Sequence, residues 1–439
     1  MVTTRARLLE GPMGTPESLR DRIASYLPSR EFLEKYSVPD PISLSRKDIY
    51  QKKFPGANYS LVFSQAERRL VIVPPWHPLN TTSMTNHAGD YGTGLFEGGS
   101  MEPVSNGREI IGANIILHEP RMNRLKKSLK GRLFDLPEGL DAFSQGIIDL
   151  ATILGESVLR DENGSPSRAY IRPEARPGLG GLGISLKEGH QIDSAAIIFN
   201  WPVYFSDPEK VYHGSGLVVA AFPEQRLFKI LGKHASNYGD AGRVGAIARS
   251  LNIDEALYFG PYLINSKTGE RTYINAQAGP EAVAQLLKNG VIADGPGEEV
   301  FAITKDRKIW FPPMDVNRLG GTTLAYIVDY MAPKLGLLTE EKPFSLEDVR
   351  RGEIESLMFA GNASRIAPIG NIKVYRENSE QIEGLNLAIS EGTQTLVEEY
   401  EAEVRGQTSP SNESLLTPVD LESGADARPI LDEVYANWF

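Results

Sequence analysis

The segment Tyr91-Gly-Thr-Gly-Leu-Phe-Glu97-Gly98 is the first of six short motifs spread along this chain. The other five, in order, are Arg121-Met-Asn-Arg124-Leu-x-x-Ser128, Tyr170-Ile-Arg172-Pro173, Lys233-x-x-x-Asn237-Tyr238, Leu319-Gly-Gly-Thr322-Thr323 and Phe359-Ala-Gly361-Asn362-Ala363. A single motif of this length is weak evidence, because short matches arise by chance. Six motifs in a defined order, with compatible spacing, are strong evidence about the fold.

The composition is that of an ordinary globular protein. With 439 residues, 41% of them hydrophobic and 23% charged, the chain can build large cores, and we expect two packed domains. A net charge of -11 argues against binding to nucleic acid or to anionic membranes, because neutralising phosphates needs a basic face. The absence of cysteine excludes disulfides, thiolate nucleophiles, cysteine zinc sites and iron–sulfur clusters.

Three further features of the sequence narrow the function. The N-terminus lacks an apolar signal core, and no apolar stretch is long enough to cross a bilayer, so we expect a cytoplasmic protein. The six histidines are scattered with no pair at metal-ligand spacing on a helix, so we expect no metal site. Residues 178–183 match the letters of a dinucleotide fingerprint, but Pro173 and Pro177 stand where a buried strand should be, which favours a plain glycine-rich loop.

Periodicity and turn residues divide the chain into five parts. These are an N-terminal extension (1–55), a small α/β domain (56–205), an interdomain linker (206–216), a large domain (217–405) and a C-terminal tail (406–439). The apolar residues from Ile382 to Val404 recur at helical spacing and predict one amphipathic helix. The tail is rich in Ser, Pro and Asn and acidic, so we expect it to be mobile, with docking restricted to its last ten residues.

The six motifs resemble, in order and over most of residues 60–370, those of the class IV aminotransferases, and above all the branched-chain amino-acid aminotransferases. The resemblance implies a mixed α/β (α+β) protein with the two-domain fold-type-IV fold of pyridoxal-phosphate-dependent aminotransferases, similar to D-amino-acid aminotransferase. It also implies pyridoxal 5'-phosphate as the cofactor and a homodimer with the active site near the subunit interface.

The resemblance places the Schiff-base lysine at Lys233. Such a lysine must spend part of its time unprotonated, and burial beside a cationic cofactor lowers its pKa enough to permit that. Tyr238 would hydrogen-bond the phenolate oxygen of the cofactor. Judged without their neighbours in the motif, Lys233 is equally a surface lysine and Tyr238 a packed tyrosine.

The remaining cofactor contacts also follow from the resemblance. Backbone N–H groups before the helix that begins at Thr322 suit a phosphate, and the Thr323 hydroxyl and Arg124 would complete the cradle, with Asn362 nearby. Alone, Arg124 fits a solvated helix face, because lysines follow it closely. The acid that holds the pyridine nitrogen protonated falls on Asp294, where the family has glutamate. Glu298 and Glu299 remain alternatives, because the insert at 261–290 makes the alignment uncertain.

Substrate recognition in the relatives uses the tyrosine of the Tyr-Ile-Arg-Pro strand and the backbone of the Thr-Ala turn. The corresponding residues are Tyr170, with Arg172 positioning the pocket, and Asn362-Ala363. The resemblance implies an apolar remainder of the pocket formed by Phe96, Tyr204 and Tyr91 from the partner subunit. Aromatic residues in a sequence are more often core than pocket, so this assignment rests on the motifs alone.

The resemblance implies ping-pong transamination between an L-amino acid and a 2-oxo acid through Lys233. Several positions depart from the family: Leu324, Asn362, His234 and Arg365. They favour a specialised substrate over housekeeping valine or leucine metabolism. Two alternatives stay open, a pyridoxal-phosphate lyase or elimination reaction on the same scaffold, and a catalytically degenerate relative that binds without turnover.

Overall fold

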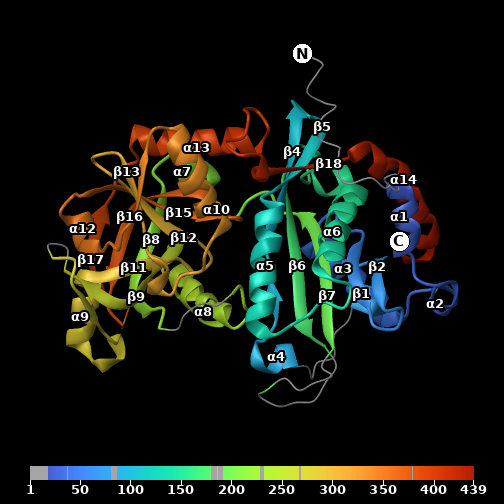
Figure 1. The fold of residues 1–439 in the computed structure, drawn as a ribbon, viewed down its shortest axis with the longest axis horizontal. Coiled ribbons are helices and arrows are strands. Elements are labelled where there is room, and N and C mark those ends of the chain that lie inside the picture. The colour runs from blue at the N-terminus through green and yellow to red at the C-terminus, as the bar shows by residue number, and fades with distance from the viewer. Residues whose placement is uncertain are drawn as a thin grey trace.

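The computed structural model describes residues 18–36, 38–80, 87–178, 185, 191–227, 232–265, 268–377 and 379–439. Within this part of the chain the strands form two separate sheets that lie side by side in Figure 1, each with its own helices. The glycine-rich segment 178–183 lies almost entirely outside the described residues. No helix in the described ranges is both long and apolar enough to span a bilayer.

The first sheet is antiparallel throughout, in the order β18-β5-β4-β6-β7-β1-β2, with β3 added at β6. Its strands are β1 (Ser60–Ser64), β2 (Arg69–Val73), β3 (Leu95–Phe96), β4 (Gly99–Asn106), β5 (Glu109–Ile116), β6 (Ala169–Pro177), β7 (Ile192–Asn200) and β18 (Leu416–Val419). Strands β1 and β2 form a hairpin, with Val62 opposite Val71.

The second sheet is mixed, in the order β10-β9-β8-β16-β15-β12-β13-β14, with β11 pairing β9 and β12, and β17 pairing β16. Its strands are β8 (Leu217–Gln225), β9 (Glu255–Ile264), β10 (Arg271–Tyr273), β11 (Gly290–Asp294), β12 (Glu299–Thr304), β13 (Lys308–Phe311), β14 (Leu338–Glu341), β15 (Ile354–Gly361), β16 (Arg365–Tyr375) and β17 (Gln381–Asn386). Strand β8 pairs in parallel with both β9 and β16, which requires crossover connections through helices.

Helices cover both sheets and join them. They are α1 (Leu19–Tyr26), α2 (Arg30–Lys35), α3 (Pro41–Lys53), α4 (His87–Tyr91), α5 (His118–Arg132), α6 (Leu140–Leu154), α7 (Pro208–His213), α8 (Asn237–Ser250), α9 (Pro280–Asn289), α10 (Thr322–Tyr326), α11 (Ala332–Lys334), α12 (Leu346–Arg350), α13 (Glu391–Val404) and α14 (Leu421–Val434). One turn of π-helix, Ile327–Met331, lies between α10 and α11. Helix α5 faces the second sheet across the junction (Figure 1).

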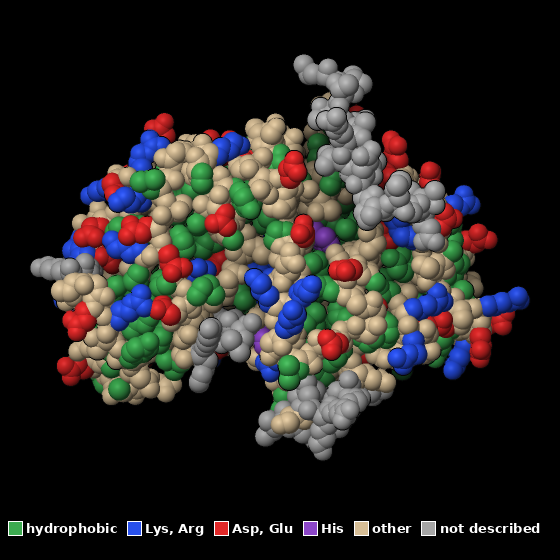
Figure 2. Space-filling view, viewed as in Figure 1, with side chains coloured by type: hydrophobic (Ala, Val, Ile, Leu, Met, Phe, Trp, Pro, Cys, Tyr) green, Lys and Arg blue, Asp and Glu red, His purple; other side chains and the backbone are tan. Residues whose placement is uncertain are grey.

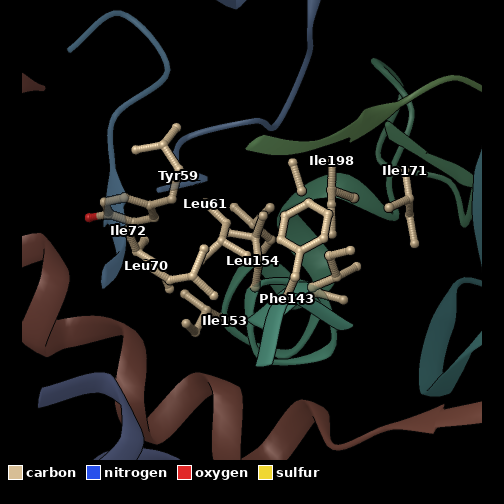
Figure 3. Packing of buried hydrophobic residues seen from close by; sticks show 14 of the residues in the cluster. Tyr59, Leu61, Leu70, Ile72, Phe143, Ile153, Leu154, Ile171 and Ile198 are labelled. Atoms are coloured by element: carbon tan, nitrogen blue, oxygen red, sulfur yellow. The ribbon is translucent and has the colours of Figure 1, made fainter. Parts of the chain in front are cut away.

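The core of the first half forms between its sheet and α6. Phe143, Ile147, Leu150 and Leu154 recur at helical spacing along α6 and are fully buried, as the pattern predicts. Figure 3 shows the Phe143 ring among aliphatic side chains of the sheet, including Leu61. This packing fixes the position of the first sheet, including the part of it that faces α5.

The C-terminal segment differs from the mobile tail that the sequence predicts. Strand β18 extends the first sheet at β5, and α14 packs against α6. The two helices approach closely at Gly424, where a Cβ would collide with the carbonyl oxygen of Thr152. Leu431 and Trp438 are buried in the same core as α6. The composition of this segment does not predict the docking, because only a few apolar residues in a polar sequence face the core.

The predicted helix from 382 to 404 is also shorter than expected. Residues Ile382 and Leu385 belong to β17, and α13 begins only at Glu391, where the Ser390 side chain accepts a hydrogen bond from the backbone N–H of Thr393. The helix prediction was too long because the apolar residues of this strand also fit helical spacing over one turn. The mixed α/β class that the sequence predicts is confirmed.

Candidate active site

A pocket opens at the junction of the two sheets, and each of the six sequence motifs contributes at least one residue to its lining. Its walls are formed by α5 and β6 from the first half and by residues at α8, α10, β12 and β15 from the second. The lining residues that the sequence analysis names are Arg124, Tyr170, Lys233, Tyr238, Asp294, Glu298, Glu299, Thr322, Thr323, Asn362 and Ala363. Gly98 from the first motif completes the ring.

Lys233 precedes α8 and points its amine at the hydroxyl of Tyr238, with which it forms a short hydrogen bond. The amine also lies 4.9 Å from the centroid of the Phe96 ring. Burial, followed by the charge of Arg124, lowers the pKa of Lys233 to about 7. An amine with this pKa is half unprotonated near neutral pH and can act as a nucleophile and as a base.

Arg124 is held in place by two contacts. Its Nε and Nη2 atoms donate to the two carboxylate oxygens of Glu97, at 2.9 and 2.7 Å, and Nη1 donates to the carbonyl oxygen of Gly320 at 3.2 Å. The side chain is 14% exposed, unlike the basic side chains that cover the α5 region in Figure 2. Arg124 therefore lies in the pocket and not on the solvated face of its helix.

Asp294 is paired with an arginine that the sequence analysis does not single out. Nε of Arg226 donates to Oδ1 of Asp294 at 2.9 Å, and the guanidinium lies 3.8 Å from the centroid of the Tyr258 ring. Burial raises the pKa of Asp294 to about 6, and Arg226 acts against that rise. The carboxylate is consequently ionised at neutral pH and still faces the pocket.

The two neighbouring glutamates have other partners. Glu299 forms a buried ion pair with Arg318. Glu298 accepts a hydrogen bond from the backbone N–H of Gly297 at 3.0 Å, and burial raises the pKa of its carboxyl. Tyr204 lies between Glu298 and Glu255, and the negative charge of Glu298 with burial raises the pKa of its hydroxyl. Of the three acids, Asp294 and Glu299 are each paired with an arginine, whereas no arginine pairs with Glu298 among the described residues.

Thr322, Thr323 and Asn362 line the same pocket as Arg124, which contacts the turn before Thr322. Both side-chain amide atoms of Asn362 are buried, and neither has a hydrogen-bond partner within the described part of the chain. A buried amide without partners is costly, so this site has unused capacity for a polar ligand. The adjacent Ala363 is fixed from the first half, because Arg168 donates to its carbonyl oxygen at 2.8 Å.

The predicted substrate residues are spread more widely than the cofactor residues. Tyr170 lines the pocket, but Arg172 does not line it and lies with its guanidinium 4.5 Å from the Phe96 ring and 5.1 Å from the Tyr170 ring. Phe96 lies beside Lys233 and stacks at 4.8 Å against Tyr238. Tyr91, in α4, is 40% exposed and lies outside this lining.

Comparison with known proteins gives a consistent result. No family model matches the sequence. The branched-chain-amino-acid aminotransferases of Salmonella typhimurium and Escherichia coli K12 are each 25% identical to the chain over 289 residues, which is 65% of this chain and 78% of the relative.

Solved structures with a similar fold also belong to branched-chain aminotransferases. The branched-chain aminotransferase of Thermoproteus uzoniensis with norvaline superposes with a TM-score of 0.62 at 20% identity, over 83% of this chain and 99% of that one. The pyridoxal-phosphate form of the Thermobaculum terrenum branched-chain aminotransferase gives 0.58 at 20% identity, over 83% and 98%. The chain is thus similar in sequence to branched-chain aminotransferases and has their fold.

Two residues that line this pocket could not be predicted from the sequence. Arg226 lies seven residues before Lys233 in a stretch without a motif, so no signal points to it. Arg121 opens the second motif, but it is assigned no role there, because Arg124 matches the phosphate position. Both arginines are recognised by their burial and their hydrogen-bond partners, which only the folded chain shows.

Proposed function

We propose that this protein is a pyridoxal-phosphate-dependent aminotransferase that binds its cofactor covalently through Lys233 and moves an amino group between an L-amino acid and a 2-oxo acid. The observation that carries the proposal is a lysine with a pKa of about 7, hydrogen-bonded to Tyr238, at the centre of a pocket built from the family motifs. The relatives in sequence and structure support the reaction type.

The residues present fit the cofactor. Thr322 and Thr323 offer hydroxyls and the N–H groups of a first helical turn, which have no partners inside the helix. Together with the unpartnered amide of Asn362 and the nearby Arg124, they form a donor set suited to a phosphate. We assign these four residues to the cofactor phosphate.

We assign the pyridine nitrogen to Asp294. Its shorter side chain replaces the family's glutamate, and Arg226 holds it as an anion through Oδ1. A carboxylate anion keeps a pyridinium protonated, and the bound cofactor then supplies an electron sink for the substrate Cα. Glu299 is committed to Arg318, which makes it the weaker candidate.

Lys233 has a second task in this proposal. Once the substrate has displaced it, its neutral amine would take the proton from the substrate Cα as general base, hold it as an ammonium, and give it back as general acid. Tyr238 orients the amine and shares its hydrogen bond. Phe96 covers one side and excludes water from the amine.

The substrate side of the proposal uses the first half of the molecule. Tyr170 and the backbone of Asn362-Ala363 would hold the substrate carboxylate, with Tyr204 and Phe96 around the side chain. We assign the exposed Tyr91 to the pocket of the partner subunit in a homodimer. The replaced family residues, Leu324 and Asn362, favour a specialised amino acid.

Reduction with borohydride in the presence of pyridoxal phosphate tests the lysine. The wild-type protein should gain the mass of one reduced cofactor on the peptide that contains Lys233, and Lys233→Ala should gain none. Lys126→Ala, at an exposed position on α5, serves as the matched control and should be labelled like wild type. A trapped cofactor in Lys233→Ala would refute the lysine assignment.

The reaction type needs a separate measurement. Incubating the loaded enzyme with a panel of amino acids should convert the bound cofactor to pyridoxamine phosphate and release the matching 2-oxo acid, both seen by mass spectrometry. Ammonia or a cleaved product without pyridoxamine phosphate would instead support the lyase alternative. No conversion and no trapped cofactor would support the degenerate relative.

A further inference from the structure

Arg121 is a buried cation in the candidate active site, and the proposed reaction assigns it no role. It lies on α5, is 2% exposed and lines the pocket together with Lys233. Its Nη1 atom makes a short hydrogen bond to the carbonyl oxygen of Gly98. Its Nε and Nη2 atoms are buried and have no hydrogen-bond partner anywhere in the described residues.

This arrangement is unfavourable unless a ligand completes it. A guanidinium carries five N–H donors, and leaving a buried charge without a counterion is strongly destabilising. The nearest acid that could serve, Glu97, is bound through both oxygens by Arg124. Burial and the charge of Arg124 lower the pKa of Arg121 to about 10, so Arg121 remains cationic at neutral pH.

The position of Arg121 separates it from the phosphate residues. Arg124 contacts Gly320 in the turn before Thr322, whereas Arg121 contacts Gly98. Gly98 adjoins Tyr170 so closely that a Cβ there would lie 2.6 Å from the tyrosine hydroxyl. Arg121 and Tyr170 therefore flank the same glycine, on the side of the pocket assigned to the substrate.

We propose that Arg121 binds a carboxylate of the amino acid substrate through its free Nε and Nη2 atoms. The inference rests on the proposed function. Nε and Nη2 lie on one edge of the guanidinium plane and match the two oxygens of a carboxylate. The site then selects amino acids over simple amines, which lack the carboxylate. Arg172 does not compete for this role, since it is held beside the Phe96 and Tyr170 rings outside the pocket lining.

Binding of unreactive carboxylates to the cofactor-loaded enzyme tests the inference. The probes are 4-methylvalerate, with one carboxylate, and glutarate, with two, titrated against the visible absorbance of the lysine-bound cofactor. The variants are Arg121→Gln and Arg121→Lys, with Lys126→Gln as a control on the same helix. We expect Arg121→Gln to weaken binding by roughly 10- to 100-fold, as for a lost charge-assisted hydrogen bond. Arg121→Lys should recover part of the loss, and Lys126→Gln should bind as wild type does.

The pattern across the two probes locates the carboxylate. Equal losses for both probes support contact with the carboxylate that every amino acid carries, and a loss for glutarate alone supports contact with a second, side-chain carboxylate. Unchanged affinity for both probes in Arg121→Gln overturns the inference. If Arg121→Gln leaves the probe affinity unchanged but weakens pyridoxal-phosphate binding, the inference is also wrong, and Arg121 would be assigned to the phosphate site. Failure of the wild-type protein to bind the cofactor would instead count against the proposed function.

Discussion

The chemistry of the pocket depends on a few side chains whose ordinary properties are altered by burial. Lys233 is the clearest example, because the protein interior and the guanidinium of Arg124 both disfavour its charged form. Asp294 is shifted in the opposite sense by burial, and Arg226 limits that shift. The motif positions of Lys233 and Asp294 could be predicted from the sequence, but the arginines that tune them lie 109 and 68 positions away along the chain.

The first prediction at this scale concerns the titration of Lys233. The neutral amine is the reactive form, and it dominates above the pKa, so labelling of cofactor-free protein by a small acylating reagent should rise through pH 7 and then level off. Ordinary exposed lysines continue to gain reactivity up to about pH 10. Mass spectrometry of the labelled peptides between pH 5 and 10 gives both curves. A Lys233 curve that keeps rising above pH 9 would contradict the lowered pKa.

At the scale of elements, the C-terminal strand and helix decide how the first half is closed. Strand β18 pairs with the edge of β5, and α14 seals α6 where Gly424 permits close contact. Tyr59, directly before β1, also donates a hydrogen bond to Asp432 in α14 at 2.6 Å. The segment from β18 to α14 therefore contributes to stability as part of the core, whereas its composition predicts a mobile tail.

Truncating one buried side chain of α14 tests this role. Leu431 is fully buried, so Leu431→Ala should lower the free energy of unfolding by about 3 kcal/mol, through lost burial and a cavity. Glu433→Ala, at an exposed position of the same helix, should change it by less than about 0.5 kcal/mol. Urea denaturation measures both variants. Equal stability of Leu431→Ala and wild type would show that α14 does not belong to the core.

Across the whole molecule, ion pairs join the two halves behind the pocket. Arg365 of β16 donates to Glu102 of β4 at 2.6 Å and also pairs with Glu401 of α13. Arg168 in turn holds the carbonyl of Ala363 in the pocket turn. Arg365 stands where many relatives have glutamate, and Glu102 supplies the opposite charge across the junction. Arg365, one of the departures from the family, therefore forms a charge pair between the two halves.

Breaking this pair should destabilise the junction. Arg365→Gln leaves Glu102 buried without its counterion, and we expect a loss of ~3 kcal/mol in unfolding free energy. Adding Glu102→Gln should restore part of the loss, because the unpaired charge is removed. Arg376→Gln, which breaks an exposed ion pair just after the end of β16, is the control and should change stability by less than about 1 kcal/mol. Denaturant titration of wild type, Arg365→Gln, Glu102→Gln and the double variant gives the coupling energy, and additive losses would exclude a direct Arg365–Glu102 interaction.

The sequence by itself indicated the resemblance to class IV aminotransferases, the mixed α/β class and most of the residues that line the pocket with Lys233, because motif order and hydrophobic periodicity can be read along the chain. Only the tertiary structure decided the pairing of Asp294 with Arg226, the unpartnered guanidinium of Arg121 and the docking of α14. Each of these depends on which distant side chains share a buried space, and burial sets both pKa values and the need for partners.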